Sequence, residues 1–206
     1  MKKYMLTAIS ILIVIALAVF AYMQHPKFGK LPSGERLERV RKSKHFRNGT
    51  FHNLNHTPVM TENVNYFKMI KNFIFSRPDG VEPIDNIPAI KTDLKNLDRN
   101  KDVMIWFGHS SYFIQIDGKR FLIDPVLRES ASPVPFTVKA FKGASIYKPE
   151  DIPDIDYLMI THDHWDHLDY ESVTHIKDRA KHVVCPLGVG ETLEYWGIDK
   201  SKLIEK

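Results

Sequence analysis

The distribution of apolar positions divides the chain into three parts. Residues 4–23 form an apolar run without a charge, residues 24–100 are rich in proline, asparagine and charge, and short apolar runs begin at Val103. A helix of twenty residues is about 30 Å long, which is the thickness of the hydrocarbon core of a bilayer. We therefore predict a membrane anchor or signal segment over residues 1–23, an extension over residues 24–100 and a globular domain over residues 101–206.

The first segment is compatible with an uncleaved anchor and with a cleaved signal. The apolar region of a signal peptide usually has about 7–15 residues, which favours the anchor, whereas Val19-Phe20-Ala21 is compatible with a cleavage site. We predict association with a membrane through residues 4–23, and a secreted or periplasmic protein if the segment is cleaved. The basic residues after this segment favour the cytoplasm for that flank, but Lys2 and Lys3 before it are typical of export. Both orientations therefore stay open.

Positive charge is concentrated next to this segment. Residues 1–47 hold 10 of the 29 lysines and arginines and 2 of the 25 acidic residues, which leaves 19 basic and 23 acidic residues elsewhere. This distribution predicts a solvated face or contact with anionic lipid head groups, and it predicts no nucleic-acid partner. Cys185 is the only cysteine, so no intrachain disulfide can form.

The domain after Val103 alternates between strand and helix patterns. Asp117-Gly118 lies between two apolar runs and predicts a tight hairpin. Apolar runs predict strands over residues 103–107, 112–116, 119–123, 157–160 and 182–187, and the start of a last strand within 198–204. Helices are predicted over residues 172–180 and 191–196, and in the extension near residues 35–43, with a turn signal at Pro78-Asp79-Gly80. The alternation indicates an α/β fold.

Histidine and aspartate residues cluster directly after the strand predicted over residues 157–160. His162 and His164 are two residues apart, so their imidazoles fall on the same side of an extended loop, and Asp166 and His167 offer a second pair of ligands. Imidazole together with carboxylate suits Zn²⁺, with Mn²⁺ or Fe²⁺ as alternatives. Water on such an ion has a pKa of about 7, so the cluster points to hydrolysis.

His162-x-His164-x-Asp166-His167 is the HxHxDH motif of the metallo-β-lactamase superfamily, which this chain resembles. The resemblance implies a four-layered αββα fold that binds two zinc ions. Further segments resemble the branch that contains N-acylphosphatidylethanolamine-hydrolysing phospholipase D and its bacterial relatives: Phe28-Gly29, Pro32-x-Gly34, Asn48-Gly49-x-Phe51, Trp106 to Ser111, Leu122 to Leu127, Ala131-Ser132-Pro133 and Pro186 to Gly190.

The resemblance implies a role for each residue of the motif. His162 and His164 would bind the first ion, and Asp166 and His167 would bind the second. Asp166 is also the expected catalytic residue, because it would help to orient the hydroxide that bridges the two ions.

Two other residues, His109 and Asp124, match positions of the family motifs. We expect a supporting or structural role for both. Asp124 precedes Pro125, so a turn at the end of a strand is an equally good interpretation of this residue.

The family pattern continues beyond the first cluster with a further histidine, a bridging aspartate and a final histidine. The histidines that follow His167 are His175 and His182, which come too early in the chain to match. The resemblance therefore implies that this chain holds the N-terminal half of the αββα sandwich and about half of the ligands.

Two functional hypotheses follow. The first is a dinuclear zinc hydrolase, similar to phospholipase D, that acts on a membrane lipid or on a small phosphodiester or ester, with this chain as a part of it. The second is a catalytically inactive fragment or split module that binds metal weakly. A β-lactamase that acts on drugs is disfavoured by the phospholipase-like surroundings of the motif, and the sequence predicts no particular oligomeric state.

Overall fold

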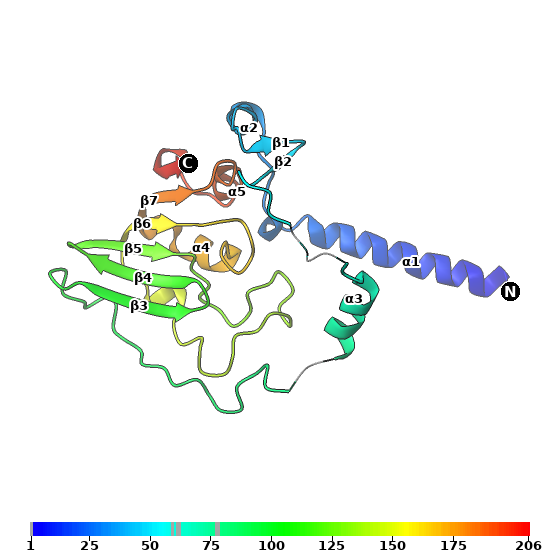
Figure 1. Cartoon of the computed structure of the whole chain (residues 1–206), viewed down its shortest axis with the longest axis horizontal. Coiled ribbons are helices and arrows are strands. Elements are labelled where there is room, and N and C mark those ends of the chain that lie inside the picture. The colour runs from blue at the N-terminus through cyan, green and yellow to red at the C-terminus, as the bar shows by residue number, and fades with distance from the viewer. Residues whose placement is uncertain (1, 59, 61–62, 77–78) are drawn as a thin grey trace.

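One large sheet dominates the computed structural model, which describes residues 2–58, 60, 63–76 and 79–206 (Figure 1). The first three strands are antiparallel neighbours, and from β5 onward adjacent strands run parallel. The six strands lie in sequence order: β3 (Val103–Gly108), β4 (Ser111–Ile116), β5 (Lys119–Ile123), β6 (Ile155–Met159), β7 (Ala180–Cys185) and β8 (Leu203–Glu205). The predicted α/β fold is confirmed.

The β4–β5 hairpin turns at Asp117 and Gly118. Both have positive φ angles, 48° and 67°, as the two central residues of a type I′ turn require. Across the hairpin Phe113 pairs with Leu122, which fixes the register of the two strands. The hairpin predicted from the sequence is therefore confirmed.

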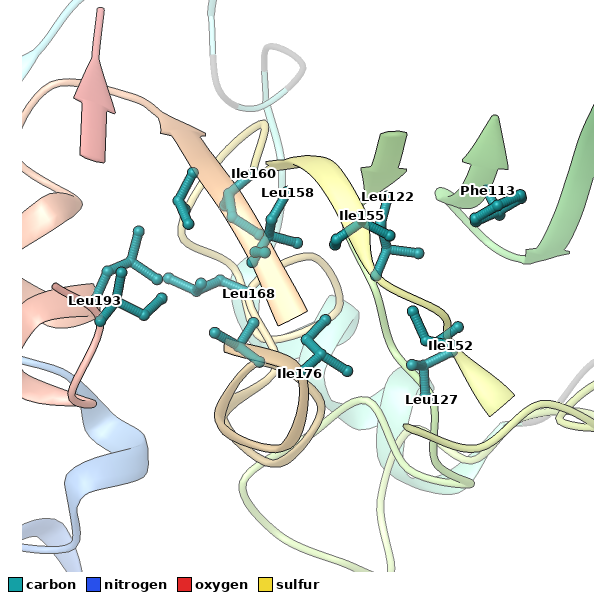
Figure 2. Close-up of a cluster of buried hydrophobic side chains, with 14 of the residues drawn as sticks. Phe113, Leu122, Leu127, Ile152, Ile155, Leu158, Ile160, Leu168, Ile176 and Leu193 are labelled. Carbon is teal, nitrogen blue, oxygen red and sulfur yellow. The ribbon is translucent and has the colours of Figure 1, made fainter. Parts of the chain in front are cut away.

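The hydrophobic core lies between the sheet and two helices, α4 (Tyr170–Ile176) and α5 (Gly190–Tyr195). Figure 2 shows Leu158 of the sheet above Ile176 of α4, with Leu168 and then Leu193 of α5 toward the left. Side chains at alternate positions of a strand share a face, and four strands each contribute a fully buried side chain to this one: Phe113, Leu122, Leu158 and Val183. Burial of this face holds the parallel strands, and therefore their carboxyl ends, in place.

The opposite face of the sheet is open within the described part of the chain. Met104, Trp106 and Ile116 project from it and are 65%, 63% and 51% exposed. The other sheet of the described residues has two strands only, β1 (Phe46–Arg47) and β2 (Thr50–Phe51). One sheet with helices on one face is consistent with the metallo-β-lactamase architecture implied by the resemblance.

Three α-helices precede the large sheet in the described part of the chain. α1 (Lys2–Met23) is long and apolar enough to cross a membrane, and its apolar window buries none of its residues against the described chain. α2 (Gly34–Arg41) agrees with the helix predicted near residues 35–43. α3 (Tyr66–Phe75) and the β1–β2 hairpin have no counterpart in the sequence prediction.

Several predicted boundaries are wrong by a few residues. α4 ends at Ile176 and a 3-10 turn follows, so β7 begins at Ala180; β7 then ends before Pro186, whose nitrogen has no hydrogen for the ladder. Asp199 caps another 3-10 turn, which delays β8 to Leu203. Pro78 of the predicted turn lies outside the described residues. Among the described residues, 3-10 turns lie at Pro26–Phe28, Pro149–Asp151, Lys177–Arg179 and Lys200–Lys202.

Candidate metal centre

The predicted ligands lie at the carboxyl edge of the parallel strands. β5 and β6 run side by side in the same direction, so Asp124 and Thr161, which follow them, meet at this edge. The backbone N–H of Asp124 donates to the carbonyl of Met159 at 2.9 Å, which extends the pairing to the last residue before the loop. The motif therefore lies on a loop at the carboxyl end of a buried strand, as predicted.

Asp124 is the buried carboxylate that holds this loop. Its side chain is 1% exposed, and its two oxygens accept hydrogen bonds from the backbone N–H (2.8 Å) and the hydroxyl (2.6 Å) of Thr161. Its Oδ2 also lies 2.8 Å from Nδ1 of His167. Because Nδ1 donates to this carboxylate, Nε2 of His167 is left free to bind a metal ion. Asp124 therefore orients His167, a predicted metal ligand. Its φ of 43° shows that Asp124 also forms the turn at the end of β5.

His109, Asp166 and His167 form a compact group of potential ligands, with one donor atom of each within 4.8 Å of the others. Oδ2 of Asp166 lies 2.9 Å from Nε2 of His109 and 3.8 Å from Nε2 of His167. His109 follows Gly108 in the β3–β4 turn, where both residues have positive φ. Only a supporting role is predicted for His109, yet the structure places its ring beside both ligands of the predicted second ion.

The first predicted ligand pair lies next to this group. The ring centroids of His162 and His164 are 4.6 Å apart, and that of His162 is 3.8 Å from that of His167. Burial and the neighbouring His167 and His164 lower the pKa of His162 below its ordinary value, so its imidazole is neutral at pH 7. The three histidines of the motif are therefore brought together, although His162 and His164 do not belong to the group of three close donors found among the described residues.

This donor set fits a transition-metal ion such as zinc. Imidazole nitrogens combined with carboxylate oxygen favour Zn²⁺, Mn²⁺ or Fe²⁺ over Mg²⁺ and Ca²⁺. The buried carboxylate behind His167 is a usual partner of a metal-binding histidine. The side chains of His109 and Asp166 are 58% and 36% exposed, so the centre is accessible from solvent. Access of this kind suits a catalytic ion, which needs an open coordination position.

A cavity of about 450 Å³ opens beside His109 and Asp166. Most of its wall is apolar and comes from β3 and from the segment after β5: Trp106, Phe107, Val126, Ala131, Val138 and Phe141. His162 and Trp165 line a second cavity, of about 980 Å³, together with parts of the N-terminal extension. The loop that carries the motif therefore borders two hollows of the surface.

His175 and His182 lie outside the centre, in agreement with the sequence analysis. Nδ1 of His175 is 2.6 Å from the carbonyl of Glu171 within α4, and the ring of His182 stacks on Tyr157 with centroids 5.3 Å apart.

One signal in the sequence could have placed His109 at the centre. His109 follows a predicted strand, and the hairpin makes this strand parallel to β5. The carboxyl ends of such strands share one edge of the sheet.

Comparison with known proteins agrees with this geometry. A family model described as "Beta-lactamase superfamily domain" matches residues 119–205, which include the motif. A UPF0173 metal-dependent hydrolase of Hyperthermus butylicus is 42% identical over 64 residues, 31% of this chain and 22% of that protein. Residues 119–205 therefore form a domain of the metallo-β-lactamase superfamily. Within the superfamily, N-acyl-phosphatidylethanolamine-hydrolyzing phospholipase D 1 of Caenorhabditis elegans is 37% identical over 101 residues, 45% of this chain and 27% of that protein.

Similarity extends beyond the metallo-β-lactamase domain. An uncharacterized protein of Mycobacterium tuberculosis is 31% identical over 165 residues, which are 79% of this chain and 44% of that protein. The match is longer than the stretch from residue 101 to residue 206, so it also includes residues before position 101. The chain spans less than half the length of this relative.

Proposed function

We propose that the protein to which this chain belongs is a metal-dependent hydrolase that cleaves phosphodiester bonds of membrane lipids. The observation that carries the proposal is the convergence of His109 with the motif residues at the carboxyl edge of the sheet. The relative named for hydrolysis of N-acyl-phosphatidylethanolamine supports this substrate class. Two zinc ions would be held by His162, His164, Asp166 and His167.

Each residue of the centre has its own task in this proposal. Bound zinc supplies Lewis acidity and a water with a pKa of about 7, which suits hydrolysis at neutral pH. The carboxylate of Asp124 accepts a hydrogen bond from the Nδ1–H of His167, so that Nε2 of His167 faces Asp166. Asp166 orients the attacking water, and His109 holds the carboxylate of Asp166 through the 2.9 Å contact.

The apolar cavity is suited to an acyl chain. Its volume of about 450 Å³ lies within the ordinary range for ligand pockets. Trp106, Val138 and Phe141 line it, and Asp166 lies at its edge. A lipid could therefore place an acyl chain in the cavity while its phosphodiester lies at the metal centre.

A hydrolysis assay on the full-length protein tests the proposal. The substrates are N-acylphosphatidylethanolamine in mixed micelles and a chromogenic phosphodiester, each with and without a chelator. Activity should disappear with the chelator and return with Zn²⁺, while Mn²⁺ and Fe²⁺ in parallel identify the metal that restores it best. Turnover that persists in the chelator, or failure of both substrates, would overturn the proposal.

A pair of histidine variants provides the matched control for this assay. His167→Ala removes a proposed ligand and should lower kcat/KM by about 100-fold or more. His175→Ala removes an exposed histidine that bonds within α4, and it should leave activity within about twofold. Equal activity of the two variants would contradict the assigned ligand.

A metal-binding module without catalytic activity is the second candidate function. It is favoured by the finding that the close donors among the described residues come from three residues, fewer than two ions require. Zinc titration of this chain separates the candidates. Weak binding of one ion and no turnover when the ion is bound would support the module, whereas turnover that depends on bound metal would exclude it.

Membrane attachment through α1 completes the proposal. The window Lys3–Met23 is apolar and unburied, and exposed lysine and arginine residues follow it in the chain between Lys30 and Arg47, where they could contact anionic head groups. After expression in cells, the full chain should remain in the membrane pellet during alkaline extraction and should retain residues 1–23 in its intact mass. Loss of these residues with release of the body would identify a cleaved signal instead.

A further inference from the structure

Helix α3 presents an apolar surface that no described part of the chain covers. All ten of its residues are exposed, and Phe67 and Phe73 are exposed by 81% and 88%. Five further large apolar side chains of α3 are at least 42% exposed: Tyr66, Met69, Ile70, Ile74 and Phe75. A contiguous apolar surface of this kind usually marks an interaction site.

The helical period separates the polar from the apolar positions of α3. With 3.6 residues per turn, Lys68, Lys71 and Asn72 lie on one side of the helix, and Phe75 at its C-terminal end is the one apolar residue of α3 on that side. The opposite side carries Tyr66, Met69, Ile70 and Phe73, with Phe67 and Ile74 at its border. Asn65 caps the helix, because its Oδ1 accepts a hydrogen bond from the backbone N–H of Lys68 at 3.0 Å. The local sequence therefore specifies an amphipathic helix.

The charges around α3 favour a lipid surface as the partner. Its polar side carries two lysines and no acidic residue, and the basic residues between Lys27 and Arg47 precede it in the chain. Figure 1 shows α1 and α3 beyond the same end of the sheet, the end toward which β6 and β7 point. A bilayer that receives α1 would thus have its surface on the side of the molecule where α3 lies. An apolar face with lysines opposite is typical of interfacial helices.

We infer that α3 lies in the plane of an anionic bilayer surface. Ten residues span about 15 Å, too short to cross the hydrocarbon core. Phe67, Ile70 and Phe73 enter the boundary of the acyl chains, and Lys68 and Lys71 remain with the head groups. This inference stands without the proposed catalytic activity, because it rests on α3 itself and on its place beyond the same end of the sheet as α1.

The inference gives the metal centre a defined setting. Tyr22, at the end of α1, contacts Phe28 with ring centroids 5.4 Å apart, and Phe28 contacts Trp165 of the motif loop at 6.2 Å. The Tyr22 hydroxyl also donates to the carbonyl of Pro133 at 2.6 Å, in the segment after β5 that helps to form the apolar cavity. With α1 and α3 in one bilayer, the centre and its cavity face the lipid surface.

Site-specific fluorescence in the full chain tests the position of α3. Cys185 is buried and is replaced by alanine, and a polarity-sensitive dye is attached at Ile70→Cys or, as the matched control, at Asn72→Cys on the opposite side of the helix. The protein is placed in nanodiscs of phosphatidylcholine and phosphatidylserine. Lipids with a quencher on the acyl chain should quench the dye at position 70 about threefold more than at position 72.

The outcomes separate the possible partners of α3. Equal quenching at the two positions overturns the inference. A blue-shifted but unquenched dye at position 70 also overturns it, because a second copy or another protein segment would then cover the helix. Lys68→Glu combined with Lys71→Glu should reduce quenching at position 70 in discs with phosphatidylserine and leave it unchanged in discs of phosphatidylcholine alone. These substitutions do not disturb the core, because α3 buries none of its residues.

Discussion

Asp124 is the single residue on which the arrangement of the metal centre depends most. It directly follows β5, its carboxylate is buried, and it contacts backbone, hydroxyl and imidazole groups of the loop that follows β6. Through these bonds the sheet sets both the position and the tautomer of His167. A metal ion would therefore meet a ligand that is already oriented.

Asp124→Asn should weaken zinc binding by about 10- to 100-fold, because the amide no longer stabilises the ligand imidazole by its charge. Competition with a chromophoric chelator measures the affinity. Asp154→Asn is the control, since Asp154 is exposed and precedes β6, whereas the centre follows it. A change of affinity as small as in the control would contradict the role of Asp124.

Asp156 is a buried carboxylate with a structural role. Burial opposes its ionisation, but Lys181 at 2.8 Å, the backbone N–H of Arg120 at 2.9 Å and Arg99 at 3.2 Å outweigh this and lower its pKa to about 2. The folded protein therefore binds this proton less tightly than the unfolded chain. The stabilisation is complete above the ordinary value of 3.8 and is lost as the pH falls through 2.

Asp156→Asn should lower the free energy of unfolding at pH 7 by roughly 2 kcal/mol, and the difference from the wild type should shrink between pH 4 and pH 2. Urea unfolding at a series of pH values checks this. The exposed Asp178→Asn serves as the control. A difference that stays constant down to pH 2 would show that the charge of Asp156 is not the cause.

At the level of secondary structure, α2 fastens the N-terminal extension to the end of the sheet. Arg36 is 8% exposed and contacts Glu191 and Glu194 of α5 and Glu205 of β8. Burial opposes ionisation of Glu205, yet hydrogen bonds from Arg36 and Arg39 lower its pKa. The guanidinium group of Arg36 thus links α5 and β8 to the N-terminal extension.

Arg36→Met should therefore lower the free energy of unfolding by roughly 3 kcal/mol, because it leaves buried carboxylates without their main partner. Arg41→Met on the same helix is the control, since its ion pair with Glu38 is exposed and should contribute less than about 1 kcal/mol. Chemical unfolding in detergent measures both. Similar losses in the two variants would refute the special position of Arg36.

At the scale of the whole molecule, the described residues leave one apolar face of the sheet uncovered. Met104, Trp106 and Ile116 belong to strands whose opposite face packs against the hydrophobic core, so their exposure comes from the arrangement of layers and not from loose folding. Apolar faces of this size promote association in water.

Met104→Lys combined with Ile116→Lys should reduce self-association of the chain, measured by sedimentation velocity in a mild detergent. The apolar area removed from contact is the physical reason. Tyr195→Lys, at an exposed position of α5, should leave association unchanged. If the double variant sediments like the wild type, the open face does not mediate contacts between copies.

The sequence by itself determined the features that depend on neighbours along the chain. Asp117-Gly118 fixed the hairpin because only certain residues adopt positive φ at both central positions, and the run 157–160 fixed a buried strand. The HxHxDH spacing identified the superfamily, and the uninterrupted apolar run predicted α1. Each of these signals is local, so no knowledge of the fold was needed.

Only the tertiary structure decided which distant residues meet. His109 and Asp124 lie far before Asp166 and His167 in the chain, and they join them because β3, β5 and β6 end at one edge of the same sheet. The strands take these places in the sheet because their alternate side chains are buried against α4 and α5. No single segment of the sequence specifies this packing. The exposure of α3 was likewise undecided by its periodicity, because an amphipathic helix can cover a core or face a membrane, and only the packing of the rest of the chain distinguishes the two.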